Sequence, residues 1–489
     1  MKNYCLNLKT ILLFILFLCL IKPASAKIVL PNIFSDNMVL QQKTKAAIWG
    51  TADAGRKVSI TTSWNHKRYD TTTGVEGKWQ INVATPAAGG PYDIRISDGD
   101  ELILNNVLIG EVWLCSGQSN MEMPLLGWGK INDYKMEIAS ANYPNIRLLQ
   151  VVHATSNVPL ENSAVSNGGW QSCSSQSVAD FSSVAYFFAR KIYEETKVPI
   201  GLIHSSWGGT IAEAWTSAQT LKEMPDFEEK VKIVEVTNNN LHANEPNRPS
   251  VLYNAMIHPF IRFSIRGAIW YQGESNVSRA YQYRELFPAM IKDWRSKFHS
   301  GDFPFYFVQL ANYMKGEKDP TPSDWAELRD AQLMTTSLPH TGMAVTIDIG
   351  LAENIHPKNK QDVGYRLALI ALAKTYRQKV QYSGPIYKSQ KIMGKEIRLR
   401  FRFTENGLKT KDNAPLTGFA IAGNNQKFYW ASAKIERNEL VVSSPDVPNP
   451  VAVRYGWSIN PDCNLYNGAG LPASPFRTDQ WKGLTWHKK

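Results

Sequence analysis

Between residue 106 and about residue 377, short apolar runs alternate with longer amphipathic segments, and this alternation constrains the fold more than any other feature of the chain. The longer segments, at 178–196, 281–298 and 360–376, have the apolar spacing of helices. Such alternation is typical of an α/β domain in which helices flank a wound parallel sheet. Open α/β sheets place their sites beyond the carboxyl ends of the strands, so the residues after each apolar run are candidates for function.

A candidate nucleophile follows the first apolar run. Residues 107–109 and 112–114 are interpreted as a short buried strand with a turn in it, and Ser119 comes just after. A serine at that place has its hydroxyl exposed at the rim of a sheet, which suits a nucleophile. A Ser-Asn pair after a strand is also ordinary turn chemistry, so the hypothesis depends on the other segments.

Two further segments offer donors for a developing oxyanion. Gly208 and Gly209 follow a second apolar run, and a glycine pair lets backbone N–H groups approach a substrate oxygen. A plain tight turn is the alternative interpretation of that pair. Gln272 and Asn276 follow a third run and carry amide donors that suit the same purpose.

A candidate base comes last. Glu353 stands three residues before His356, shortly ahead of a helical pattern. A serine hydroxyl needs an imidazole to take its proton, and the imidazole needs a carboxylate to fix its tautomer. His258 lies in the same Ile-His-Pro tripeptide as His356, but it has no acid three residues before it and is interpreted as structural.

These segments together resemble the SGNH hydrolase superfamily, and their wording is similar to its sialate O-acetylesterase branch. The similar motifs are Gly-Gln-Ser-Asn-Met-Glu at 117–122, Trp-Gly-Gly-Thr at 207–210, Trp-Tyr-Gln-Gly-Glu-Ser at 270–275 and Ile-His-Pro-Lys-Asn-Lys at 355–360. Segments at 30–41 and 464–479 are also similar, so the resemblance covers nearly the whole mature chain. It implies an SGNH-type sheet and an esterase that removes O-acetyl groups from sugars, with sialic acid as the substrate.

The acid departs from the superfamily pattern, which usually has Asp three residues before the base where this chain has Glu353. Three arrangements stay open. Glu353 completes a triad, Ser119 and His356 work as a dyad, or another acid such as Asp348 takes part.

The third motif also departs, because Gly273 is followed by Glu-Ser-Asn instead of the usual x-Asn-Asp. Gln272 therefore becomes the first candidate for the oxyanion-binding amide, and Asn276 the second. The backbone N–H of Ser119 and one from the glycine pair would complete the oxyanion hole.

Aromatic residues could provide a platform for a sugar ring, although most of the 15 tryptophans are expected in the core. The tryptophans near the motifs are Trp113, Trp128, Trp207, Trp215 and Trp270. Glu274 is a polar candidate for substrate binding. Arg329 could meet a sialate carboxylate, with a helix-surface salt bridge as the alternative.

The first 26 residues are expected to be a cleaved signal peptide. Lys2 and Lys9 precede the apolar run 11–18, and Ala-Ser-Ala at 24–26 suits cleavage. This predicts a protein secreted across the membrane, either periplasmic or extracellular, that begins at Lys27. No second long apolar run follows, so no membrane span is expected in the mature chain.

The mature chain is too long for one ordinary domain. The strand-like alternation at 58–62, 92–96 and 396–403 predicts β domains on both sides of the α/β domain. The expected divisions are a β-sandwich-like domain at 27–105, a catalytic domain at 106–377, a second β domain at 378–455, and a C-terminal segment at 456–489 that packs back on the catalytic domain.

Charge and composition narrow the possible partners. Cleavage of the signal removes three lysines and no acidic residue, so the formal charge falls from +11 to +8, and no basic tract indicates nucleic-acid binding. No metal-binding or phosphate-binding motif is recognised, so no metal and no cofactor is expected. Cys115, Cys173 and Cys463 remain, so at most one disulfide can form, and Cys115 is expected in the core.

The expected partner is an acetylated sugar or glycan, and the oligomeric state stays open. Deacetylation of xylan or another polysaccharide is an alternative within the same chemistry, because such reactions differ only in the shape of the pocket. A catalytically inactive carbohydrate-binding protein is the alternative from another class.

Overall fold

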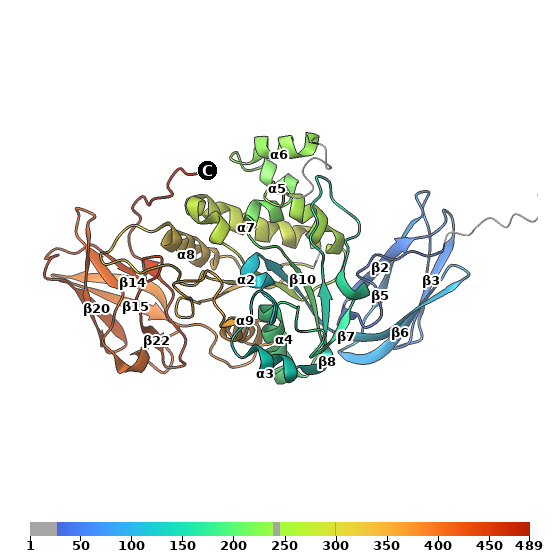
Figure 1. The fold of residues 1–489 in the computed structure, drawn as a ribbon, viewed down its shortest axis with the longest axis horizontal. Coiled ribbons are helices and arrows are strands. Elements are labelled where there is room, and N and C mark those ends of the chain that lie inside the picture. Colours follow the sequence, from blue (N-terminus) through green and yellow to red (C-terminus); the bar gives the residue numbers. More distant parts are fainter. Residues whose placement is uncertain (1–26, 238–244, 299) are drawn as a thin grey trace, which may run out of the picture.

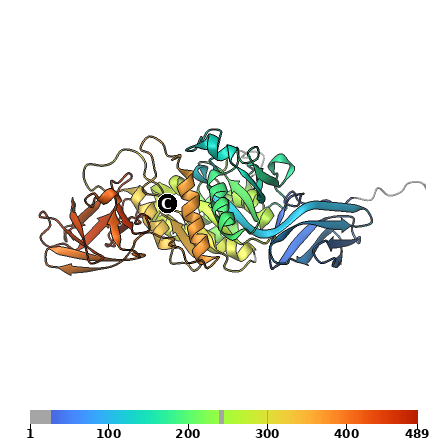
Figure 2. The same ribbon diagram turned by 90° about the horizontal axis from the view of Figure 1, so that it is seen from below.

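The computed structural model describes residues 27–237, 245–298 and 300–489, and the expected signal peptide lies outside them. Three regions follow one another along the long axis of the molecule, as Figures 1 and 2 show: N-terminal strands, a central region of strands and helices, and C-terminal strands. In these three described stretches, no helix is long and apolar enough to cross a membrane.

The central sheet has β7 in its middle, in the order β13-β12-β11-β7-β10-β8-β9. Its strands are β7 (Glu101–Gly117), β8 (Asn142–Gln150), β9 (Gln171–Ser174), β10 (Ile200–Ser206), β11 (Gly267–Tyr271), β12 (Phe305–Val308) and β13 (Thr341–Ala344). Neighbours are parallel except for β9, which runs antiparallel to β8, so the sheet is mixed. The later strands add to both sides of β7, and a crevice forms where the direction of strand order reverses in this way.

Helices cover both faces of this sheet (Figure 1). Trp113 of β7 and Trp270 of β11 point to opposite faces, since Trp113 pairs with a residue three positions before Trp270. The Trp113 ring contacts Phe188 of α4, whereas the Trp270 ring contacts Trp294 of α7. The long helices are α4 (Ser183–Thr196), α7 (Ala280–Phe298), α8 (Asp324–Thr335) and α9 (Lys360–Lys374). The three helices expected from the sequence are confirmed, with α4 beginning five residues later than expected.

Shorter helices lie at the ends of the central strands and in the connections between them. They are α2 (Ser119–Glu122), α3 (Tyr134–Ala139), α5 (Ala218–Lys222) and α6 (Glu228–Val236). A 3-10 turn, η6 (Glu274–Arg279), follows β11 and leads into α7.

The N-terminal strands share β7 with the central sheet. They are β1 (Val39–Gln41), β2 (Lys45–Thr51), β3 (Lys57–Thr62), β4 (Arg68–Thr72), β5 (Lys78–Ala84) and β6 (Gly89–Ser97). The first half of β7 pairs with β6 and β1, and its second half pairs with β10 and β11. The turn expected between 107–109 and 112–114 is therefore wrong, because one strand of 17 residues runs through both. The expected domain boundary at 105/106 falls inside this strand.

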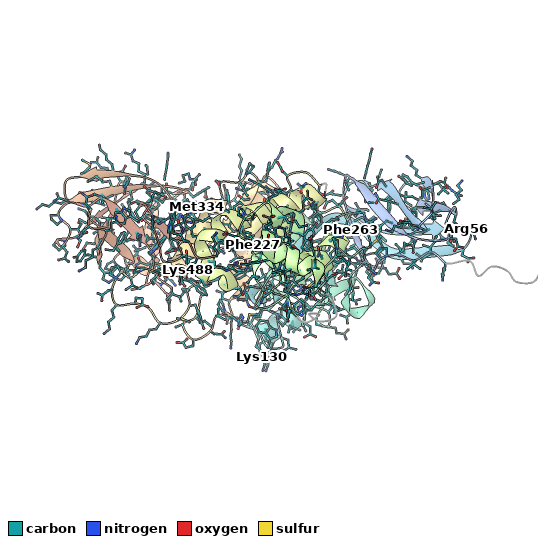
Figure 3. The ribbon with its side chains drawn as sticks, turned by 90° about the horizontal axis from the view of Figure 1, so that it is seen from above. Arg56, Lys130, Phe227, Phe263, Met334 and Lys488 are labelled. Carbon is teal, nitrogen blue, oxygen red and sulfur yellow. The ribbon has the colours of Figure 1, made fainter. Side chains whose placement is uncertain are left out.

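One continuous hydrophobic core joins the N-terminal strands to the central region. Phe34, near the start of the described chain, contacts Trp49 of β2 on one side and Phe263 of the central region on the other. Phe263 lies where these two regions meet (Figure 3). Cys115 is buried in this core as expected, and no disulfide joins cysteines among the described residues.

The C-terminal strands have a core of their own. They are β14 (Ile386–Met393), β15 (Glu396–Arg402), β16 (Leu408–Thr410), β17 (Phe419–Ala422), β18 (Phe428–Trp430), β19 (Ser432–Glu436), β20 (Glu439–Ser443), β21 (Ala452–Tyr455), β22 (Leu465–Asn467) and β23 (Phe476–Arg477). The chain end then returns to the central region, where Trp486 contacts Tyr281 at the start of α7 and Lys489 pairs with Asp226 (Figure 1).

Candidate active site

Ser119 and His356 lie in contact although 237 positions separate them in the sequence. Ser119 begins α2 just after β7, and His356 lies in the loop before α9. A hydrogen bond of 2.9 Å joins Ser119 Oγ to His356 Nε2, and both residues are half-buried. A base must lie this close to a hydroxyl to take its proton.

The turn between β7 and α2 depends on Gly117. Its φ is +142°, and a Cβ there would lie 2.2 Å from the Tyr271 carbonyl oxygen. Gln118 ties the same turn to the end of β11, because its backbone N–H donates to that oxygen over 3.0 Å and its side-chain oxygen accepts from Gly273 over 3.3 Å. The close approach of β7 and β11 thus fixes where Ser119 begins.

The acid expected beside His356 lies elsewhere. Glu353 is exposed, and no carboxylate in the described part of the chain hydrogen-bonds the His356 ring. Asp348 accepts two hydrogen bonds from the Arg366 guanidinium, of 2.6 and 2.8 Å, and one from Tyr466. Of the three arrangements that the sequence leaves open, this geometry favours the Ser-His dyad.

His356 has a lowered pKa, because the ring is partly buried and the positive charge of Lys360 opposes a second charge there, while Glu122 acts in the opposite direction. The neutral imidazole is the form that accepts a proton. The lowered pKa therefore keeps the base in its active form at mildly acidic pH.

The loop with the glycine pair lies against the nucleophile. A Cβ on Gly208 would come within 3.2 Å of the Ser119 Cβ, and Gly209 has a φ of +73°. The backbone N–H of Gly208 donates to Glu122 Oε2 over 2.6 Å, so this expected oxyanion donor already has an acceptor. Ser119 is the first residue of α2, so its N–H has no acceptor within the helix and stays a candidate donor.

The two expected amide donors are engaged with each other. Gln272 Nε2 donates to Asn276 Oδ1 over 2.6 Å and to Thr210 O over 3.2 Å. Asn276 Nδ2 donates to Glu213 Oε2 over 3.0 Å. These bonds connect the end of β11 to the segment after β10, so in this structure both amides support the site from behind.

Burial removes three of the expected sugar contacts. Trp113, Trp270 and Arg329 are fully buried, so a ligand at the surface cannot reach their side chains. Arg329 donates to four backbone carbonyls, those of Leu310, Ala311, Ser458 and Ile459. Its role is to join the central region to the C-terminal segment, which corrects both the sialate-carboxylate and the surface salt-bridge interpretations.

Two tryptophans remain beside the nucleophile. Trp128 is 56% exposed, and its edge faces the His356 ring with centroids 5.1 Å apart. Trp207 stacks on His153 with centroids 4.3 Å apart and an interplanar angle of 4°. Trp207 was among the expected substrate contacts, and Trp128 was one of the nearby tryptophans. Both stay available for a sugar ring.

Several residues near the pair were not singled out in the sequence. His153 Nε2 lies 3.0 Å from Glu122 Oε1. Burial raises the pKa of Glu122, but the interaction with His153 and the hydrogen bond from Gly208 outweigh it, and the pKa lies below its usual value. No signal in the sequence points to His153, which lies in an irregular connection.

Lys360, by contrast, carries a signal that sequence analysis could have used. It is the first residue of α9, where the helix dipole disfavours a cation, and it ends the Ile-His-Pro-Lys-Asn-Lys motif. Asn120 next to Ser119 is its partner, at 2.7 Å. Across the described ranges, no group of three or more metal-ligating side chains is placed to hold a metal ion.

Comparison with known proteins defines the class. Residues 109–373 match the family of carbohydrate esterases described as sialic acid-specific acetylesterases. The chain is 32% identical to human sialate O-acetylesterase, with 92% of each chain covered, and 30% identical to the mouse enzyme, with 91% of this chain and 93% of that one covered. The structure of a carbohydrate acetylesterase from Xanthomonas citri, 39% identical, superposes with a TM-score of 0.85 over 93% of this chain and 100% of that one.

The chain is therefore an esterase of the carbohydrate esterase class. More narrowly, it belongs to the family of sialic acid-specific acetylesterases, since the matching segment spans more than half of its residues and includes both Ser119 and His356.

Proposed function

We propose that the chain is a secreted serine esterase that removes O-acetyl groups from sugars, with O-acetylated sialic acids as its substrates. The observation that carries the proposal is the 2.9 Å hydrogen bond between Ser119 Oγ and His356 Nε2, in a chain from an acetylesterase family. The parallel strands around β7, with Ser119 just beyond the carboxyl end of that strand, support an SGNH-type catalytic domain.

The reaction follows from this pair. Ser119 Oγ attacks the acetyl carbonyl carbon while His356 Nε2 takes the hydroxyl proton. The carbonyl oxygen becomes an oxyanion, which the N–H of Ser119 and the glycine loop after β10 stabilise. The bond to the sugar oxygen then breaks, and His356 returns the proton to that oxygen. Water, activated by the same imidazole, hydrolyses the acetyl-enzyme and releases acetate.

Substrate binding is proposed on the exposed side of the pair. Trp128 and Trp207 offer aromatic faces there, while Glu274 lies behind the nucleophile and is bonded to Asn120. Secretion is proposed from the N-terminal sequence alone, with the periplasm or the extracellular space as the destination.

Acetate release from a panel of O-acetylated sialic acids and from acetylated xylan tests this proposal. Wild type is compared with Ser119→Ala, and Ser337→Ala, at an exposed position after α8, serves as the control. We expect release from the sialates that disappears in Ser119→Ala and persists in Ser337→Ala.

The other outcomes each overturn one part. Release from xylan with none from the sialates would keep the serine chemistry and overturn the substrate. Release that survives in Ser119→Ala would overturn the serine mechanism, and no release from any acetylated sugar would overturn the activity itself.

A further inference from the structure

His356 lacks a carboxylate partner in the described part of the chain, so something else must hold its ring toward Ser119. The backbone on each side of His356 is held by a side chain from another element. Asn120 Nδ2, from α2, donates to the Ile355 carbonyl over 3.0 Å. Lys360 Nζ, from α9, donates to the Pro357 carbonyl over 2.8 Å.

These two side chains form one buried unit. Lys360 Nζ donates to Asn120 Oδ1 over 2.7 Å, and Asn120 Nδ2 donates to Glu274 Oε1 over 2.6 Å. Asn120 thus links the buried cation to a carboxylate with which it forms no direct ion pair. Asn120 also follows the nucleophile directly, so this unit connects the serine turn to the histidine loop.

Stability alone does not explain Lys360. Its side chain is fully buried, it stands where the helix dipole disfavours a cation, and a buried ammonium without a directly paired anion is costly. Burial also lowers its pKa to about 7, with Glu274 acting in the opposite direction. Glu274 Oε2 is buried and lacks a hydrogen-bond partner among the described residues, so the polar network is not fully satisfied. Strongly perturbed groups of this kind cluster at functional sites.

We infer that Lys360 is a positioning residue, which together with Asn120 holds the His356 loop so that the imidazole faces Ser119 in place of an orienting acid. This inference rests on the proposed function, since it requires the Ser-His pair to be the reacting pair. It gives Lys360 a second effect, because its charge lowers the pKa of His356.

The charge effect has a definite sign. The charged groups that act on His356 are Lys360 from α9, which lowers its pKa, and Glu122 from α2, which raises it. Removing the lysine charge therefore raises the pKa of His356. Because the neutral imidazole is the base, the rate rises with pH through that pKa, and the acid limb must move to higher pH.

The test compares Lys360→Met with wild type on 4-nitrophenyl acetate, with kcat, KM, the pH profile of kcat/KM and thermal unfolding as readouts. Lys358→Met on the same loop is the matched control, because Lys358 is exposed. For Lys360→Met we expect kcat to fall about 100-fold, the cost of a base misplaced by about 1 Å. We also expect a KM within about twofold, an acid limb at higher pH and an unchanged or raised melting temperature.

A second variant covers the case in which Lys360→Met does not fold. Asn120→Ala removes the bond to Ile355 and should also lower kcat more than it raises KM. Where both variants fold, the double variant should lose little more than either single one, because both act through one loop.

Outcomes that overturn the inference are distinct from those that overturn the proposed function. Wild-type kcat and an unmoved acid limb in Lys360→Met, with Ser119→Ala inactive, would overturn the inference alone. A loss of activity that matches the loss of folded protein, without a shift of the limb, would do the same. Activity that survives in Ser119→Ala would overturn the proposed function and the inference with it.

Discussion

At the scale of single residues, the absence of a carboxylate on the His356 ring leads to a direct prediction. Replacing an orienting acid in a Ser-His-Asp triad lowers kcat about 10⁴-fold. Glu353 is exposed, so Glu353→Gln should keep kcat within about threefold of wild type, like the control Glu317→Gln at another exposed position. Steady-state kinetics with an aryl acetate measures this. A fall of 100-fold or more, confined to Glu353→Gln, would restore the triad.

The sequence predicted the reacting residues better than their partners. Ser119 and His356 are found from local motifs, because a nucleophile after a strand and a base before a helix are local features. The partners of Gln272 and of Arg329 depend on which distant segments lie beside them, and sequence spacing does not reveal this. An amide that suits an oxyanion hole equally suits a support behind it.

At the scale of elements, the junction of β7 with α2 depends on Gly117. Gly117→Ala adds a Cβ where the Tyr271 carbonyl oxygen lies, at a φ that L-residues rarely adopt. Gly394→Ala is the matched control, since Gly394 has a φ of +61° and open space around it. The control should lose about 1 kcal/mol of unfolding free energy. Gly117→Ala should lose at least about 2 kcal/mol more, together with most of the activity.

Urea unfolding and acetate release measure the two variants of this junction. Equal losses in both would show that backbone conformation, and not the contact with β11, is what matters at Gly117. Full activity in Gly117→Ala would show that Ser119 does not depend on this turn.

Element type was easier to predict than element extent. Amphipathic spacing identifies α4, α7 and α9, because one face of each must be buried against the sheet. The 17-residue β7 was divided in the prediction, since Gly110 and Glu111 interrupt its apolar runs. In the structure both lie in the strand, where Gly110 is crowded by Pro199 and Glu111 pairs with Arg266. Such tertiary contacts override local propensity.

At the scale of the whole molecule, the expected N-terminal and catalytic domains are one body in terms of packing. They share β7 and a continuous core, whereas the C-terminal strands have a separate core. A change in composition marks where strands give way to helices, but a strand that continues from one sheet into the next carries no such mark. The division drawn at 105/106 therefore cuts through the element that carries Ser119.

The C-terminal strands are joined to the central region through polar contacts, of which Arg329 makes the most extensive set described here. Its guanidinium donates to two carbonyls before α8 and two in the C-terminal segment, and burial lowers its pKa to about 9. Arg329→Met leaves those carbonyls without their donor. Each unsatisfied buried group costs about 1–3 kcal/mol, so the variant should lose at least about 3 kcal/mol of unfolding free energy.

Urea unfolding and limited proteolysis check this prediction, with Arg400→Met as the control, since Arg400 belongs to an exposed pair with Glu439. The control should change stability by less than about 1 kcal/mol. Arg329→Met should also expose the C-terminal segment to protease at temperatures where wild type resists, while the KM for acetylated sialic acid in the remaining folded protein stays unchanged. A raised KM with unchanged stability would instead return Arg329 to the substrate site, which its complete burial argues against.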